Sequence, residues 1–179
     1  GPAYGVGHGR ELGRVLFRSR ISLDARLDWD DVVLSEPARR RLAEVLTAFA
    51  DPEGAASVGI EAPAGLLLHG PPGTGKTTVA KVLASVAEAS FLEVSASDLL
   101  SKFAGESEQR VTRLFARARA VRPTIIFIDE VDVLLRRRRP DSVPPWDDRV
   151  VNAFLRQLDG LQGRSGVLLV AATIRPAVL

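Results

Sequence analysis

Short apolar runs alternate with stretches of helical periodicity along most of this 179-residue chain. Four runs read as strands, because each is too short for a helix and is bounded by glycine, proline or polar residues. They cover residues 65–69, which we expect to be buried, 91–95, 124–129 and 166–173. Strands that alternate with helices predict a parallel sheet in an α/β fold.

Apolar positions three and four residues apart predict a helix before or after each of these strands. Ser35 is placed to cap the first helix, which begins at Glu36-Pro37 and ends at residues 51–54. A helix over about residues 107–120 has the clearest period. The predicted apolar stripes are Leu42, Val45, Leu46 and Phe49; Val79, Val82, Leu83 and Val86; Val111, Leu114, Phe115 and Ala118; and Val150, Phe154, Leu155 and Leu158.

A glycine-rich loop follows the first predicted strand and fits the phosphate-loop pattern G-x-x-x-x-G-K-[ST]. Its glycines let the backbone wrap closely around phosphate, with N–H groups pointing inward at a helix N-terminus. Lys76 supplies a positive charge for the β- and γ-phosphates, and Thr77 supplies a hydroxyl ligand for Mg²⁺. The predicted nucleotide-binding residues are Gly70, Pro71, Pro72, Gly73, Thr74, Gly75, Lys76, Thr77 and Thr78.

Two carboxylates, Asp129 and Glu130, end the third predicted strand. A buried strand delivers such groups to the carboxyl edge of the sheet, where ligands bind in open α/β folds. Asp129 would hold Mg²⁺ through water, and Glu130 would activate the attacking water as general base. An ordinary acidic turn is the alternative, and the phosphate loop upstream favours catalysis by Glu130 and Lys76.

From Leu27 onward the sequence resembles the large subdomain of an AAA+ ATPase, and within it the AAA group that includes valosin-containing protein. Besides the two motifs above, the resemblance rests on residues 28–32, 58–60, 101–108, 149–160 and 171–176. It implies a three-layer P-loop NTPase fold with a parallel sheet. Residues 28–179 would form this subdomain without its final strand, arginine fingers and helical lid, which in the family follow position 179.

The resemblance also implies a function. Members of this family form rings of six subunits that bind ATP and Mg²⁺ between neighbours and pull a polypeptide through the central pore. The segment with Asp31 and Val32 matches the one whose backbone lies against adenine. Lys102 and Phe103 match the first pore loop, where the aromatic residue grips the substrate. ATP-driven protein remodelling or unfolding by a hexamer is therefore the leading expectation.

The sequence departs from the family pattern at sites that concern catalysis. Ile174 stands where the family has asparagine, and it cannot hydrogen-bond the γ-phosphate or the lytic water. Val33 and Leu34 replace two glycines and would crowd the adenine pocket. With these changes, and without the parts beyond position 179, we expect the chain itself to bind nucleotide weakly and to hydrolyse it slowly or not at all.

Two other functions stay open. Ile174 favours a nucleotide-binding structural subunit that does not hydrolyse ATP, whereas intact Lys76, Asp129 and Glu130 oppose it. Four arginines at 136–139 weakly favour a nucleic-acid motor or loader; they also fit a basic pore lining, and a solvated loop is the interpretation we favour. The pore-loop match and a net charge of only +2 argue against nucleic acid as the partner.

Composition narrows the remaining possibilities. The chain has no cysteine and two histidines, which excludes disulfides and leaves little scope for zinc. No apolar run reaches the roughly 18 residues of a membrane span, so a cytoplasmic protein is the expectation. Residues 1–27 read as a leader that is either disordered or not native. The second alternative rests on residues 14–19, which are encoded by CGT GTG CTC TTC CGA TCT, the end of a common sequencing adapter.

Overall fold

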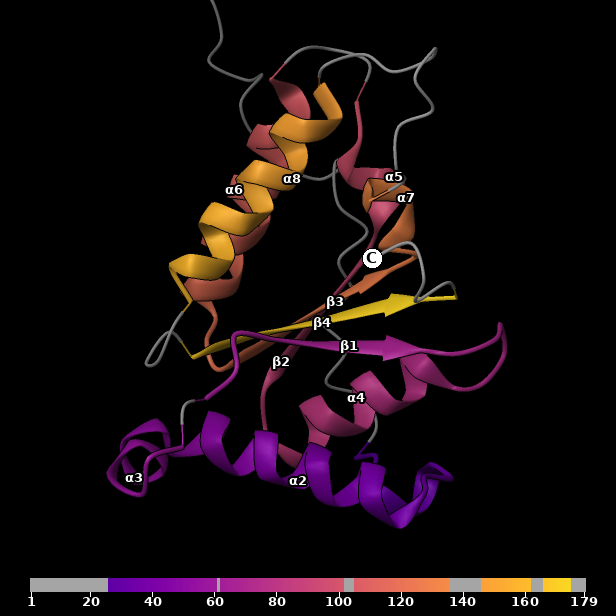
Figure 1. Ribbon diagram of the computed structural model, residues 1–179, viewed down its shortest axis with the longest axis vertical. Coiled ribbons are helices and arrows are strands. Elements are labelled where there is room, and N and C mark those ends of the chain that lie inside the picture. Colours follow the sequence, from indigo (N-terminus) through magenta and orange to yellow (C-terminus); the bar gives the residue numbers. More distant parts are fainter. Residues whose placement is uncertain (1–25, 61, 102–104, 136–145, 162–165, 175–179) are drawn as a thin grey trace, which may run out of the picture.

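A computed structural model describes residues 26–60, 62–101, 105–135, 146–161 and 166–174. Most of the predicted leader, the pore-loop residues Lys102 and Phe103, and the arginines at 136–139 lie outside these ranges. Four parallel strands form one sheet in the order β1-β4-β3-β2 (Figure 1). They are β1 (Gly65–His69), β2 (Ser90–Ser95), β3 (Thr124–Asp129) and β4 (Val167–Thr173).

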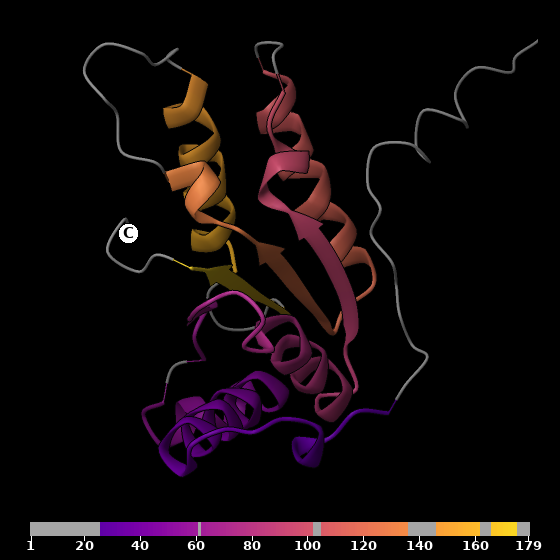
Figure 2. The same cartoon turned by 90° about the vertical axis from the view of Figure 1, so that its right-hand side faces the viewer.

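Helices cover both faces of the sheet, as the predicted three-layer fold requires. On one face lie α2 (Glu36–Ala50) and α4 (Lys76–Val86), with the short α3 (Pro52–Ser57) beside them (Figure 1). The other face carries α6 (Glu106–Ala120) and α8 (Trp146–Asp159), with the short α5 (Ala96–Leu99) and α7 (Asp132–Leu135) (Figures 1 and 2). A 3₁₀ turn, η1 (Trp29–Asp31), precedes α2. No helix in the described ranges is long and apolar enough to cross a membrane.

Two apolar clusters hold the layers together, and β3 contributes to both. Ile125 and Phe127 join the cluster under α2 and α4, while Ile126 and Ile128 join the cluster under α6 and α8. All four side chains are fully buried. A central parallel strand is covered on both faces, which explains why its sequence is apolar at consecutive positions.

The first strand is where the predicted burial is wrong. β1 has the predicted bounds, but its side chains alternate between exposed and half-buried. Leu67 is 45% exposed, because β1 lies at the edge of the sheet and pairs only with β4 among the described strands. An apolar run alone does not tell an edge strand from a central one.

Most of the predicted stripe residues are buried or half-buried, and two are not. Val86 is exposed because it is the last residue of α4, at the end of the packed stripe. Leu155 is exposed because it lines an open apolar hollow with Val151 and with Leu67 of the exposed edge strand β1.

The predicted helix ends need two corrections. Ser35 precedes α2 as expected, but its side chain makes no capping hydrogen bond. Residues 51–54 end α2 and also begin α3, because Asp51 Oδ1 accepts a hydrogen bond of 2.9 Å from the amide of Gly54. The helices α3, α5 and α7 and the turn η1 were not predicted, since each is too short to show a period.

Candidate functional site

The phosphate-loop residues connect β1 to the first turn of α4 in the strand–loop–helix order that the motif predicts. Gly73 has φ 75° and Gly75 has φ 84°, a left-handed conformation that glycine adopts without a steric penalty. A Cβ atom added at either position would meet no other residue within 4 Å. Backbone conformation, and not crowding within the chain, therefore requires glycine at these two positions.

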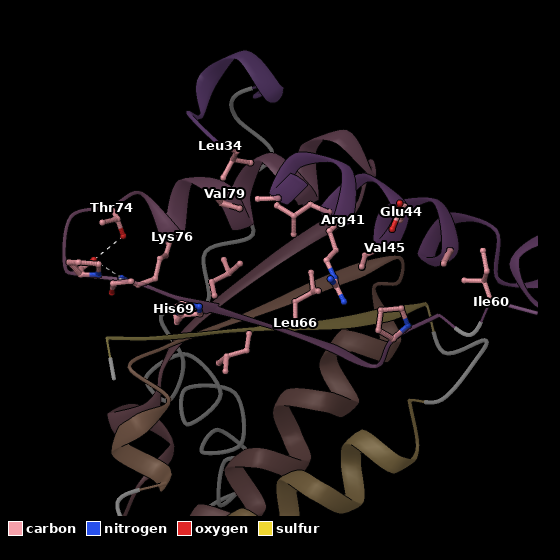
Figure 3. Close-up of a pocket in the computed structure, with 18 residues that line it drawn as sticks. Leu34, Arg41, Glu44, Val45, Ile60, Leu66, His69, Thr74, Lys76 and Val79 are labelled. Atoms are coloured by element: carbon pink, nitrogen blue, oxygen red, sulfur yellow. Dashed lines mark hydrogen bonds between the residues drawn. The ribbon is translucent and has the colours of Figure 1, made fainter. Parts of the chain in front are cut away.

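Side chains of the loop bond back to its own carbonyl groups (Figure 3). The Lys76 ammonium donates to the carbonyl oxygens of Gly70 at 2.8 Å and Pro71 at 2.9 Å. The Thr74 hydroxyl donates to the same Pro71 oxygen at 2.8 Å. These bonds hold the ammonium over the loop and use two of its three N–H groups.

The acidic pair lies at the carboxyl end of β3, as predicted. Asp129 is half-buried, and its Oδ1 accepts a hydrogen bond of 2.8 Å from the amide of Glu130. Glu130 is exposed and has φ 55°, an uncommon left-handed conformation for a residue with a side chain. Backbone strain of this kind is found where the surrounding structure fixes a turn.

The end of β4 brings the loop and the acidic pair together. The amide of Gly70 donates to the carbonyl oxygen of Thr173 at 3.2 Å, and the amide of Val131 donates to that of Ala172 at 2.9 Å. β4 lies between β1 and β3, so the two motifs sit on either side of its end, about two strand spacings or 10 Å apart. This is the carboxyl edge at which open α/β sheets bind ligands.

A cavity of about 890 Å³ between α2 and β1 opens beside the phosphate loop (Figure 3). Its lining is mostly apolar, and Leu34 and Val79 lie near Lys76 at the loop end. The predicted crowding by Val33 is wrong, because that side chain is fully exposed, whereas Leu34 does line the cavity.

The predicted adenine residues lie just outside this cavity. Val32 packs against the apolar cluster under α2 and α4. The Asp31 carboxylate caps η1 by accepting a hydrogen bond of 2.8 Å from the amide of Asp28. Their predicted contact with adenine stays a prediction.

The predicted Mg²⁺ ligands are Thr77, half-buried in the first turn of α4, and Asp129. Within the described ranges, no three His, Cys, Asp or Glu side chains are grouped so that they could hold a metal ion. Magnesium is usually held by one or two carboxylates together with phosphate oxygens and water, and not by an all-protein cage. One hydroxyl at the phosphate loop and one carboxylate at the end of β3 therefore fit a nucleotide-bound Mg²⁺.

Two groups of hydrogen-bonded polar side chains, one of them at the site, were not predicted. The Thr173 hydroxyl donates to Asp132 at 3.1 Å, and both residues are buried. In the sequence, Asp132 stands two residues after Glu130 and Thr173 lies in the segment 171–176, but neither position indicates a bond between them. Ile174 follows Thr173 directly and is exposed.

The second group surrounds the start of α6. Arg110 donates to the carbonyl oxygens of Asp98 at 2.9 Å and Leu100 at 2.7 Å, and to the Glu106 carboxylate at 2.9 Å. The Ser101 hydroxyl also donates to Glu106. The bond from Ser101, followed by the one from Arg110, lowers the pKa of Glu106 below its ordinary value. These contacts fix both ends of the segment that contains Lys102 and Phe103.

Known proteins are similar to this chain in sequence. A Schizosaccharomyces pombe AAA domain-containing protein is 50% identical over 128 residues, 72% of this chain and 16% of that protein. The ribosome biogenesis ATPase RIX7 of Saccharomyces cerevisiae is 46% identical over 128 residues, 72% of this chain and 15% of that protein. The chain thus spans about a sixth of the length of these relatives.

A solved structure supports the same assignment. The FIGL-1 AAA domain in complex with ADP superposes with a TM-score of 0.74 and 36% identity, over 98% of this chain and 59% of that one. The family described as "ATPase family associated with various cellular activities (AAA)" matches residues 66–179, from β1 onward. The chain therefore belongs to the AAA family of ATPases.

Proposed function

We propose that the protein containing this chain binds ATP with Mg²⁺ at the phosphate loop and hydrolyses it. The observation that carries the proposal is the pair of hydrogen bonds at the end of β4, from Gly70 on one side and Val131 on the other. They support a site in which a phosphate cradle faces a carboxylate pair. The ADP bound to the FIGL-1 domain agrees with a nucleotide as the ligand.

Each residue has a separate role in this proposal. The loop amides from Gly70 to Thr78 and the Lys76 ammonium bind the β- and γ-phosphates and stabilise the charge that develops on them. Glu130 accepts a proton from the attacking water. Thr77 and Asp129 would hold Mg²⁺, which would neutralise negative charge on the β- and γ-phosphates. Asp31 and Val32 would place their backbone against adenine.

We further propose that the complete protein works as a ring, in which Lys102 and Phe103 contact a polypeptide that hydrolysis drives through the pore. This part rests on the resemblance and on the contacts of Ser101, Glu106 and Arg110, which fix both ends of that segment. Hexameric assembly and protein remodelling follow from the same resemblance.

A second candidate is a structural subunit that binds nucleotide without hydrolysing it. Ile174 favours it, because the residue after β4 presents an exposed apolar side chain beside the site. The intact acidic pair favours the ATPase, so the structural subunit is the alternative that turnover measurements decide.

The test measures Mg-ATP binding by calorimetry and ATP turnover, both in the complete protein and in its variants. Lys76→Ala removes the ammonium, and we expect the affinity for Mg-ATP to fall about tenfold or more, since a charged hydrogen bond is lost. Glu130→Gln should keep binding and lower turnover by about 10²–10⁴-fold.

Lys81→Ala is the matched control, because Lys81 lies on the same helix and its exposed pair with Glu93, at 3.6 Å, contributes little. Binding by Lys76→Ala equal to that of the unmodified chain would refute the proposal. Binding that depends on Lys76, with turnover absent in the complete protein, would leave only the structural subunit.

A further inference from the structure

Thr173, the last residue of β4, is bonded to both halves of the site. Its carbonyl oxygen accepts a hydrogen bond of 3.2 Å from the amide of Gly70, where the phosphate loop begins. Its hydroxyl donates to Oδ1 of Asp132 at 3.1 Å. Asp132 begins α7 two residues after Glu130. One residue therefore connects the phosphate loop to the turn that carries the proposed base.

The contact between Thr173 and Asp132 is buried, which makes it stronger than a bond at the surface and makes its loss more costly. Thr173 is 1% exposed and Asp132 is 8% exposed. A hydrogen bond to a carboxylate is stronger in such surroundings than in water, and a buried carboxylate without a donor would be costly. Asp132 therefore favours the arrangement in which the acidic turn stays next to β4.

The acidic turn needs such a restraint. Glu130 lies in a strained left-handed conformation at an exposed position. Backbone bonds from Val131 to Ala172 and from Val133 to the Glu130 carbonyl hold the turn. The side-chain bond from Thr173 to Asp132 adds a second link between the turn and the end of β4.

Ile174 makes the bond between Thr173 and Asp132 more important for the geometry of the site. The residue after β4 has no polar group with which to fix a phosphate or a water beside Glu130. Orientation at the end of β4 then depends on the residues before it, of which Thr173 is the one that contacts the acidic turn through its side chain.

We propose that Thr173 and Asp132 are positioning residues, which hold Glu130 at a fixed place relative to the phosphate loop. The inference rests on the proposed ATP hydrolysis, since it names residues that orient its base. The geometric part, in which Thr173 restrains the acidic turn, does not need catalysis and can be measured alone.

The test compares Thr173→Val, which removes the hydroxyl at nearly constant shape, with Thr173→Ser, which keeps it. In the complete protein, we expect Thr173→Val to lower kcat for ATP hydrolysis about tenfold, because one hydrogen bond is lost, and to change KM less than about twofold. Thr173→Ser should restore most of the lost rate. A residue that only stabilises the fold would lower kcat only through the amount of folded protein, so it would change neither constant once each rate is divided by the concentration of folded protein.

Hydrogen exchange of the backbone amides gives the second measurement, in the same 179-residue chain without nucleotide. The amides of residues 131–134 should exchange about tenfold faster in Thr173→Val than in the unmodified chain or Thr173→Ser, since the restraining bond is lost. The amides of the core strand β3 serve as the internal control and should not change.

Equal exchange at residues 131–134 in all three proteins would overturn the inference, whatever the turnover. Faster exchange there, with kcat unchanged in an active protein, would overturn the catalytic part. If the unmodified chain shows no binding that depends on Lys76, the proposed function fails. The exchange result then still decides whether Thr173 restrains the turn.

Discussion

β1 and β3 both end at the site and both are apolar, yet they lie in different surroundings. The side chains of β3 are buried from Thr124 to Ile128, whereas those of β1 alternate between exposed and half-buried. β3 has a neighbouring strand on each side, and β1 has only β4 among the described strands. Position in the sheet, and not apolar content, decides how much each strand contributes to the core.

The two halves of the site are consequently held in different ways. The acidic pair extends from a strand that is buried on both faces. The phosphate loop extends from the edge, where bonds from Lys76 and Thr74 to the loop carbonyls hold its shape. Local hydrogen bonds thus preserve the geometry of the loop where the strand before it is only partly packed.

The largest effect should come from truncating the centre of β3. Phe127 is fully buried and stacks on Phe91 with ring centroids 6.0 Å apart. Phe127→Ala should lower the free energy of unfolding by about 3–5 kcal/mol, because it removes apolar burial and leaves a cavity. Leu67→Ala, on exposed β1, should lower it by less than about 1 kcal/mol.

Urea unfolding measures both variants, and the midpoints are comparable if the slope m is unchanged. Equal losses in the two variants would break the comparison. They would mean that another surface covers β1 in solution.

Ile174→Asn should have the next largest effect, at the end of the central strand β4. One positioned polar group at such a site is worth about 10²–10³ in rate, so turnover should rise by up to that factor. Stability should change little, because Ile174 is exposed. Steady-state turnover in the complete protein measures the gain.

Ile174→Val is the matched control, since it changes the shape without adding a polar group. A rise in turnover with Ile174→Asn but not with Ile174→Val would show that the missing polar group after β4 limits the rate, although the phosphate loop is intact. No gain would place the limit elsewhere in the protein.

Asp51→Ala sharpens the comparison on the side of β1. Asp51 caps α3, which precedes β1 in the chain, and its loss should cost about 1 kcal/mol. Asp51→Asn keeps an acceptor and should lose less. The free energy of unfolding is again the measurement, and an alanine variant as stable as the asparagine variant would contradict the capping role.

The smallest effect concerns how the stability of the fold changes with pH through Glu106, at the start of α6. Hydrogen bonds from Ser101 and then Arg110 lower the pKa of Glu106, so its ionised form stabilises the folded state. That contribution is present above the ordinary glutamate range and is lost as pH falls through the lowered pKa. The stability difference between the unmodified chain and Glu106→Gln should therefore shrink on acidification. A difference that stays constant from neutral to acidic pH would refute it.

Local patterns in the sequence predicted much of this structure. The bounds of β1 and β3 were predicted to the residue, because apolar runs between breakers are local signals. The phosphate loop and the acidic pair were also local. Their meeting at the end of β4 followed from the general rule for parallel sheets.

Features that depend on distant residues were not predicted. The bond between Thr173 and Asp132 joins positions 41 residues apart, and nothing near either residue specifies it. Val33 and Leu34 lie in opposite directions because the chain is extended after η1, and the sequence did not show which of the two would face the cavity. Edge position likewise depends on the strand order of the whole sheet.

Glu130 has a positive φ, so the residue that the proposed reaction requires at position 130 is not the residue that would make the fold most stable. Glycine adopts this conformation freely, and asparagine tolerates it better than glutamate does. A laboratory selection for heat resistance alone would therefore enrich glycine or asparagine at position 130 and discard the carboxylate. Consensus or automated stabilisation of this domain would have to hold that position constant, because the gain in melting temperature there would come at the expense of the reaction.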